Sequence, residues 1–496
     1  MRNYLVITPI LLPFVTAVVM LLLFRHNRTV QRVLSVVSVL ALIGLEIALM
    51  LRLRGGEIAV HKMGNWDAPF GIVLMADILS GIMLLLASIT ALAALTFGLW
   101  DNDRERERLH FYPLFQFLLM GINGAFLTGD LFNLFVWYEV LLIASYALLT
   151  LGSEPRQLRV GIPYVALNLL SSALFLVAAA VLYGVTGTLN MADLSRQIAA
   201  LDGARETMAQ VAAVILLCVF GTKAAIFPLF FWLPDGYPAP PVSVATIFAG
   251  IMTKVGVYSI LRVFALVFRG DGLAASLVLP LAAATMLVGV LGAIGQTNFR
   301  RLLSFHIISQ VGFMLMGIGM FTPLGIAGGV IYIIHHIMVK SGLFLVSGVC
   351  ERATGRANIE EMGGLMKSFP WLAVLFFIAG SSLAGMPPLS GFFAKFMVIK
   401  AGFDGKHSLV VGVSLVASLL TLFSMMKVWQ NVFWREAPRE WTRQPRVIYL
   451  PVTLLVSFSL VLSAVAGPLF SLGMDAAKQL SQPQLYIETV LGKEAK

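Results

Sequence analysis

Charged residues are scarce in this chain, at 12% of its 496 residues against about a quarter in soluble domains. Hydrophobic residues make up 59% of the chain. Apolar runs long enough to cross a membrane recur from residue 4 to residue 473. This composition excludes a soluble globular protein and leaves no room for a separate soluble domain. The first run lacks a small-residue cleavage site and is too long for a signal-peptide core, so we expect it to be a membrane span.

Cysteine is almost absent. Cys218 and Cys350 lie in or beside apolar runs, far apart in sequence, and indicate neither a disulfide framework nor a metal site. Dinucleotide fingerprints, phosphate loops, metal-ligand spacings and nucleophile–base motifs are also missing. We therefore expect no enzyme activity and no cofactor. Much of the net charge of +10 lies in short loops such as RHNR and DNDRERER, where arginines set topology, so we expect no nucleic-acid partner.

The apolar runs predict an all-α integral membrane protein of about fourteen transmembrane helices. The predicted spans are 4–24, 30–51, 70–99, 111–129, 131–152, 158–186, 208–233, 241–268, 274–296, 301–320, 323–349, 370–401, 408–434 and 447–474. Arginine and lysine are more frequent in the loops that follow odd-numbered spans than in the other loops. Those richer loops are predicted to face the cytoplasm, which places both termini outside.

Prolines interrupt two of the predicted spans. Pro228 follows Lys223 in the seventh, and Pro387 and Pro388 stand in the middle of the twelfth. Proline removes a backbone donor and clashes with the preceding turn, so both helices should be broken. The breaks are five spans apart, which favours inverted five-helix repeats of helices 4–8 and 9–13. The predicted units are therefore 1–110 (helices 1–3), 111–268 (first repeat), 274–434 (second repeat) and 447–496 (helix 14 and tail).

Ionisable residues lie inside otherwise apolar spans, at Glu139, Lys223, Lys254 and Lys340. A charge at the bilayer centre costs roughly 2.5–3.5 kcal/mol on insertion scales. A common explanation is a polar path along which protons or cations move, whereas the alternative is a set of structural ion pairs. Because a nearby carboxylate changes how tightly a buried lysine holds its proton, Glu139 and Lys223 would form an electrostatic switch.

Further residues extend the predicted relay. Lys254 is near the centre of its span, where its amine cannot easily reach either surface. His336 and Lys340 are one helical turn apart and share a helix face. Lys395 follows the second break and could be the last station before the aqueous phase. The weaker candidates, each with an interfacial or structural alternative, are His306, His335, Asp130, Lys427, Asp77 and Glu46.

One stretch is the most specific in the chain: KAAIFPLFFWLPDGYPAPPVSVATIFAGIMTKVGVYSILRV. With it, the chain resembles the antiporter-like membrane subunits of respiratory complex I, membrane-bound hydrogenases and Mrp-type multisubunit sodium/proton antiporters. Within this family, GNWDAPFGIVLMAD and LLSFHIISQVGFMLMGIGM make it most similar to the Mrp type. Complex I subunits of the fourth-subunit type carry a glutamate at the place of Lys395, which argues against that assignment.

The resemblance implies a function. The family's relay residues fall on Glu139, Lys223, Lys254, His336, Lys340 and Lys395. It implies proton transfer along these residues, coupled to Na⁺ movement in a complex with other Mrp-type membrane subunits. It also implies a multi-pass protein of the bacterial cytoplasmic membrane. Two alternatives stay open: a proton-translocating subunit of a redox complex, and a membrane scaffold subunit that transports nothing.

Overall fold

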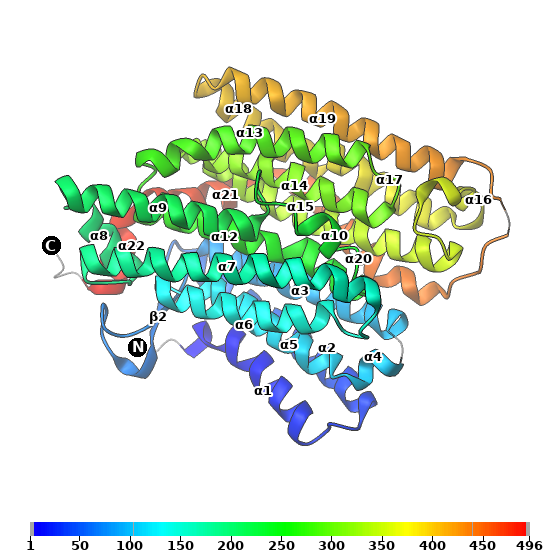
Figure 1. Cartoon of the computed structure of the whole chain (residues 1–496), viewed down its shortest axis with the longest axis horizontal. Coiled ribbons are helices and arrows are strands. Elements are labelled where there is room, and N and C mark those ends of the chain that lie inside the picture. Colours follow the sequence, from blue (N-terminus) through cyan, green and yellow to red (C-terminus); the bar gives the residue numbers. More distant parts are fainter. Residues whose placement is uncertain (1–3, 103, 439, 493–496) are drawn as a thin grey trace.

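The computed structural model describes residues 4–102, 104–438 and 440–492. Within these residues the chain is almost entirely helical, and its one sheet has two strands. The long helices lie side by side along one common direction (Figure 1). This arrangement satisfies backbone hydrogen bonds inside each helix, as a bilayer requires.

Eleven helical segments of the described chain are long and apolar enough to cross a membrane, and three shorter apolar helices accompany them. The short ones are α1 (Thr8–Leu22), α5 (Phe111–Leu127) and α17 (Pro370–Ala384). All of them fall in the regions for which the sequence predicts spans. The long ones are α2 (Arg28–Leu53), α3 (Ile78–Asp101), α6 (Leu131–Leu149), α7 (Pro155–Thr186), α9 (Gly203–Ala224), Val242–Val267, α13 (Gly272–Ile294), α14 (Phe299–Ile318), α15 (Pro323–Thr354), Ser408–Trp434 and Arg446–Ala464.

Shorter elements connect the spans, complete the broken ones or follow the last one. They are η1 (Tyr4–Val6), β1 (Ala59–Lys62), η2 (Met63–Asn65), β2 (Val73–Ala76), α4 (Arg104–Arg108), α8 (Met191–Ile198), α10 (Leu233–Gly236), η5 (Ile359–Glu361), α16 (Leu365–Ser368), α18 (Ser390–Asp404), α21 (Ala466–Ser481) and α22 (Pro483–Leu491). β1 and β2 pair antiparallel, with Ala59 opposite Ala76.

Two predicted spans are wrong in their bounds. The prediction for 70–99 runs through β2, and α3 begins only at Ile78, because Asp77 caps it by accepting a hydrogen bond from the Ser80 backbone N–H. The prediction for 447–474 crosses a helix end. There α20 (Tyr449–Ala464) ends and α21 starts again at Ala466, with Pro468 in its first turn, where proline is tolerated.

Both predicted helix breaks are confirmed. The seventh span ends as α9 at Ala224, and helix resumes in α10. The twelfth ends as α17 at Ala384, and helix resumes in α18. Each first half ends at a residue with left-handed backbone, Ala225 (φ 58°) or Gly385 (φ 93°). The inverted repeat and the four predicted units remain predictions.

The eighth span is irregular in a way that the sequence did not predict. It consists of α11 (Val242–Ile247), a π-helical turn η3 (Phe248–Met252), α12 (Thr253–Arg262) and a second π-helical turn η4 (Val263–Val267). A further π-helical turn, η6 (Trp429–Trp434), ends the thirteenth span after α19 (Ser408–Val428). Such turns weaken the regular hydrogen-bond ladder and are frequent at functional sites.

The elements between spans gather at the two ends of the bundle. Figure 1 places α4 and α16 at one end and β2, α8 and α22 at the other. The arginine-rich loops of the sequence adjoin the first group. The predicted orientation of the chain termini concerns residues 1–3 and 493–496, which lie outside the described residues.

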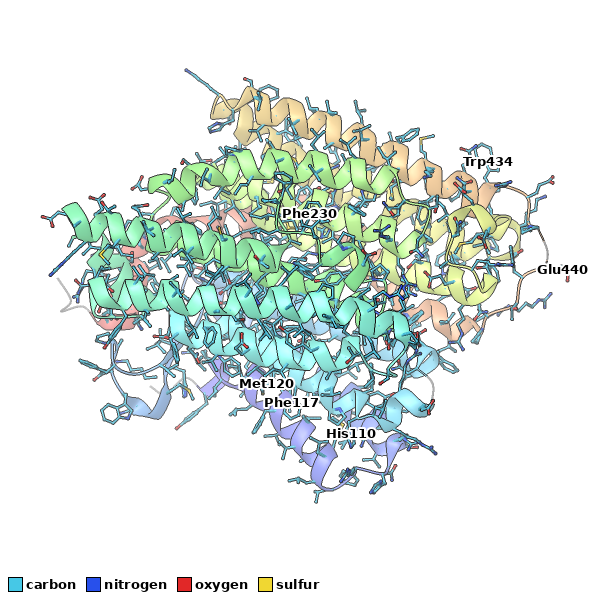
Figure 2. All side chains as sticks on the ribbon, viewed as in Figure 1. His110, Phe117, Met120, Phe230, Trp434 and Glu440 are labelled. Carbon is cyan, nitrogen blue, oxygen red and sulfur yellow. The ribbon has the colours of Figure 1, made fainter. Side chains whose placement is uncertain are left out.

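The most buried spans are Val242–Val267, α15, α14 and α3. In the middle of the bundle, Phe230 lies in the segment between α9 and α10 (Figure 2). Its ring stacks on Phe231 at 4.6 Å and meets the ring of Phe305 edge-on at 6.5 Å. Packing of this kind covers the unwound backbone at membrane depth.

Candidate ion-conduction site

The centre of the site is α15, whose residues His335, His336 and Lys340 are completely buried. Neither ring nitrogen of His336 has a hydrogen-bond partner among the described residues, and the same holds for Lys340 Nζ. Buried polar groups normally find partners in protein or ordered water. A histidine and a lysine on one helix face, with free nitrogens, can exchange protons through water.

The first helix break holds Lys223, which lies in the last turn of α9 and is 6% exposed. Its Nζ donates to Asn168 Oδ1 at 3.0 Å. The Glu139 carboxylate, on α6, accepts a hydrogen bond from the hydroxyl of Ser172. Asn168 and Ser172 are four residues apart on α7, so they share one helix face. This face of α7 therefore holds both members of the predicted switch.

Tyr138 connects the first break to the irregular eighth span. Lys223 Nζ lies 5.7 Å from the centroid of the Tyr138 ring. The Tyr138 hydroxyl donates to Ser259 Oγ at 2.7 Å on α12. Gly256, on the same helix, touches α9 so closely that an added Cβ would lie 2.5 Å from the backbone nitrogen of Ala224. Only glycine permits this approach of the two helices.

Lys254 is completely buried at the start of α12. Its Nζ donates to the carbonyl oxygen of Ala249 at 2.6 Å. Ala249 lies in the π-helical turn η3, where the widened backbone makes a carbonyl available to a side chain. The irregular helix therefore supplies the oxygen that holds this amine in an apolar region.

At the second break, a backbone carbonyl again binds the amine of a buried lysine. Lys395, on α18, is 4% exposed, and its Nζ donates at 2.8 Å to the carbonyl oxygen of Ala384, the last residue of α17. Carbonyl groups at a helix C-terminus lack intrahelical partners and favour cations. Gly385 gives the lysine room, because an added Cβ would lie 2.8 Å from Lys395 Cδ.

Hydroxyl groups connect the second break to α15. His335 Nδ1 lies 2.9 Å from Ser390 Oγ, and Ser390 is the first residue of α18. Ser390 Oγ also lies 3.1 Å from Ser382 Oγ and 3.0 Å from Ser459 Oγ. Chains of hydroxyl groups can both accept and donate a proton. These serines could not be predicted from the sequence, because serine is common in helices and no spacing marks them.

Two weaker candidates bind helix ends. Lys427 Nζ donates to the carbonyl oxygens of Ile294 and Gln296, each at 3.0 Å, where α13 ends. Asp130 caps α6 and accepts a hydrogen bond from the Asn133 backbone N–H at 2.7 Å. Both contacts favour the structural alternative for these residues. His306 is buried, and its Nε2 lies 2.9 Å from Ser424 Oγ.

Asp130 provides a prediction about pH. Burial raises the pKa of its carboxyl to about 6, since backbone hydrogen bonds offset the burial only in part. A raised carboxyl pKa stabilises the fold fully below the unfolded value near 3.8, and that stability is lost as pH rises towards 6. Asp130→Asn keeps the cap and should remove up to about 3 kcal/mol of this loss at pH 7. Thermal unfolding at pH 4 and 7 measures it, with the exposed Asp475→Asn as control; equal pH dependence in both variants would contradict the assignment.

The candidates interact electrostatically as a series. Glu139 acts on Lys223, and Lys254 acts on both Lys340 and His336. The remaining links are those of His306 with His336, Lys340 and Lys395, and of His335 with His336 and Lys395. The structure therefore pairs Glu139 with Lys223 and brings Lys254, His336, Lys340, Lys395 and both weaker histidines into one row. Tyr138 contacts Lys223 and, through Ser259, the helix α12 that carries Lys254.

A buried ion pair is the main feature that the sequence analysis missed. Arg262, 2% exposed on α12, forms an ion pair with Asp77 at 2.5 Å. Both Nε and Nη2 of Arg262 also donate to the Tyr258 hydroxyl. Asp77 was considered interfacial or structural, which agrees with this contact. An arginine inside the apolar run YSILRVFALVF was the signal that could have found it.

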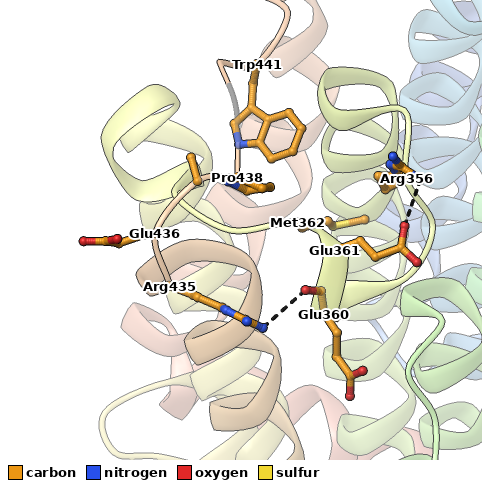
Figure 3. A pocket seen from close by; sticks show the side chains of 9 residues that line it. Arg356, Glu360, Glu361, Met362, Arg435, Glu436, Pro438 and Trp441 are labelled. Atoms are coloured by element: carbon orange, nitrogen blue, oxygen red, sulfur yellow. Dashed lines mark hydrogen bonds and ion pairs between the residues drawn. The ribbon is translucent and has the colours of Figure 1, made fainter.

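One surface pocket of the described chain lies apart from the row of lysines. A pocket of about 790 Å³ opens between the loop after α15 and the loop after η6 (Figure 3). Arg356 forms an ion pair with Glu361 at 3.1 Å in its wall. The pocket is lined by Arg356, Glu360, Glu361, Met362, Arg435, Glu436, Ala437, Pro438 and Trp441, and none of these is a relay candidate. Clusters of three or more metal-ligating His, Cys, Asp or Glu side chains do not occur in the described part of the chain.

Two broken helices, each with a lysine at the break, and a buried row of lysines and histidines between them define an antiporter-like membrane protein. The family model described as NADH:quinone oxidoreductase/Mrp antiporter, TM matches residues 128–421. The D subunit of the Na⁺/H⁺ antiporter of Alkalihalophilus pseudofirmus is 47% identical over 493 residues, which cover 99% of each chain. The chain belongs to this family of multi-pass membrane proteins, and among its relatives are the D subunits of Na⁺/H⁺ antiporters.

Solved structures of similar chains have the same fold. A chain of the Mrp complex from Dietzia sp. is 30% identical, with a TM-score of 0.93 over 99% of this chain and 100% of that one. A chain of the archaeal membrane-bound sulfane sulfur reductase is 25% identical, with a TM-score of 0.92 over 98% and 100%. Both neighbours are parts of complexes, and the second is an archaeal respiratory membrane complex.

Proposed function

We propose that the chain is a subunit of a secondary cation/proton antiporter, and that it moves protons along its buried row of ionisable residues, coupled to Na⁺ extrusion. The observation that supports this most is the series of buried, interacting groups from Lys254 through Lys340 and His306 to Lys395, together with the Glu139–Lys223 pair. Buried charges inside a membrane are costly and mark ion pathways. A scaffold protein would need paired charges, whereas Lys340 and His336 have no protein partner among the described residues.

Proton uptake is proposed at the break after α9. There a proton binds Lys223, and the position of Glu139 controls its release. Both side chains are bound to α7 but come from α6 and α9, so a shift of one of these two helices against the other changes their separation. Since two unit charges interact as the inverse of their distance, such a shift changes the proton affinity of Lys223.

The proton then moves through Lys254 to His336 and Lys340, and leaves by way of His335 and Lys395. The charged amines of Lys223, Lys254 and Lys395 each donate a hydrogen bond, either to a backbone carbonyl or to a side-chain amide oxygen. A carbonyl cannot take the proton away, so the proton stays available for the next residue. Water between the free nitrogens would complete the path.

The coupling to Na⁺, the partner subunits and the orientation in the membrane are properties of the assembled complex. Other Mrp-type membrane subunits are the proposed partners, and the lipid bilayer surrounds the apolar faces. Both termini are proposed to lie outside the bacterial cytoplasmic membrane. The transported ions are H⁺ and Na⁺, and the described residues offer no cluster of carboxylates for a Na⁺ cage. We therefore propose that Na⁺ affects the row from a neighbouring subunit by its charge.

A redox-driven proton pump is the second candidate, favoured by the likeness to the sulfane sulfur reductase chain. Vesicles containing the complex test both candidates. Addition of Na⁺ should dissipate an imposed pH gradient without any electron donor, and vesicles that lack this chain should not respond. Proton movement that requires an electron donor would support the redox complex, and absence of any flux would support a scaffold.

A further inference from the structure

A second set of buried polar side chains lies outside the row of lysines, on the inward face of α2. The buried residues of this helix include Gln31, Ser35, Ser38 and Glu46. Their spacing of three, four and eight residues keeps them on one helix face. A lipid-embedded helix needs no polar face, so this stripe calls for a physical explanation.

Glu46 is completely buried between α2 and α3. Its Oε1 accepts a hydrogen bond from Ser88 Oγ at 2.9 Å, and its Oε2 has no partner among the described residues. The helices that pack on α2 bring no counter-charge: α1 and α5 contain no charged residue, and Asp101, the only one in α3, is its last residue. An ionised carboxylate without a counter-charge is very costly in such a place, so Glu46 requires a proton.

Amide oxygens without a partner among the described residues occur on α2 and α5, which pack against each other. The side-chain oxygens of Gln31, Gln116 and Asn123 are buried and have no partner within the described chain. Their orientation is set, because each NH₂ group donates to a backbone carbonyl: Gln31 to Phe24, Gln116 to Ser35 and Asn123 to Pro9. All the free atoms are acceptors, which fits water or a hydrated proton as the missing donor.

The end of this path at the surface of the bundle is polar as well. Next to Gln31, Arg32 forms an ion pair with Glu107 at 2.8 Å, and the Tyr112 hydroxyl donates to the same carboxylate at 2.7 Å. Tyr112 and Gln116 are one turn apart on α5. This end adjoins the arginine-rich loops, near α4 in Figure 1.

At its other end, inside the bundle, the path approaches the row of lysines across α3. This helix presents Ser88 to Glu46 and packs against α11, η3 and α15 on its other side. There Thr90 and Ser341 both adjoin Gly250, and neither hydroxyl has a partner in the described chain. Ser341 follows Lys340 directly. One helix therefore separates Glu46 from the centre of the site.

We propose that Glu46 is a proton-binding site at the end of a second polar path, formed by α1, α2, α3 and α5, which carries protons between the row of lysines and the arginine-rich end of the bundle. The path is separate from the one that begins at Lys223. The ligand is the proton itself, delivered through water between the free amide oxygens. This proposal rests on the proposed function only for its last step, the transfer to the row.

Infrared difference spectra of the intact complex, recorded across a pH step, test the proposal without need for transport. A protonated-carboxyl band should be present, should disappear in Glu46→Gln, and should persist in Glu57→Gln, which changes an exposed loop carboxylate. If Glu46→Gln fails to accumulate, Ser88→Ala provides the same test, since loss of its hydrogen bond should shift the band. A band unchanged in these variants overturns the proposal.

Proton flux in vesicles provides the second readout. Glu46→Gln should slow flux about tenfold, and Gln116→Leu should slow it in the same direction with the complex still assembled. Flux at the unaltered rate in Glu46→Gln overturns the path. Because the infrared band does not depend on antiport, failure of this proposal is distinguishable from failure of the proposed function.

Discussion

Replacing Glu139 or Lys223 by alanine is expected to abolish Na⁺-dependent proton flux, with a loss of at least about 100-fold, while the complex still assembles. The physical reason is that Glu139 acts electrostatically on Lys223, the lysine at the first helix break. Without the lysine no group there can hold the proton, and without the carboxylate its release is no longer controlled. Flux is measured as the decay of a pH gradient in vesicles.

Matched variants make this test specific. Glu206→Ala and Lys478→Ala remove exposed charges of the same types and should leave flux unchanged. Asn168→Ala and Ser172→Ala should reduce flux severalfold, because each releases one member of the pair from α7. Normal flux in both Glu139→Ala and Lys223→Ala would refute the relay.

Replacing Arg262 by methionine is expected to lower the free energy of unfolding by about 3–5 kcal/mol, since Asp77 is then left buried without its counter-charge. Asp77→Asn in the same chain should recover part of this loss, because the uncompensated charge is gone. The exposed pair of Arg356 with Glu361 is the control, and Arg356→Met should cost less than about 1 kcal/mol. Thermal unfolding of the purified complex gives the values, and similar losses in both arginine variants would contradict the argument.

The Asp77–Arg262 pair also predicts a pH dependence. Burial alone would raise the pKa of Asp77, but the charge and hydrogen bonds of Arg262 hold it below its usual value. A lowered carboxyl pKa adds stability above the unfolded value, and this stability is lost as pH falls through the folded value. The acid limb of the unfolding curve should therefore disappear in the Asp77→Asn, Arg262→Met double variant.

Much of the fold could be predicted from the sequence. Long apolar runs predict spans because every backbone group in a bilayer must be satisfied within the helix. Prolines at 228, 387 and 388 predicted both breaks because they remove backbone donors. The hairpin of β1 and β2 was not predicted, since its second strand is apolar and continues almost directly into α3. The π-helical turns had no signal either, because they arise from packing between helices.

The residues that are costly in a membrane can be found without a structure. Glu139, Lys223, Lys254, Lys340 and Lys395 are visible because ionisable groups stand out in apolar runs. Their connections require the folded chain, because their neighbours come from distant segments: Asn168 for Lys223, Ser390 for His335 and Asp77 for Arg262. Hydrogen bonds act over about 3 Å, and sequence spacing cannot set a distance between side chains on different helices.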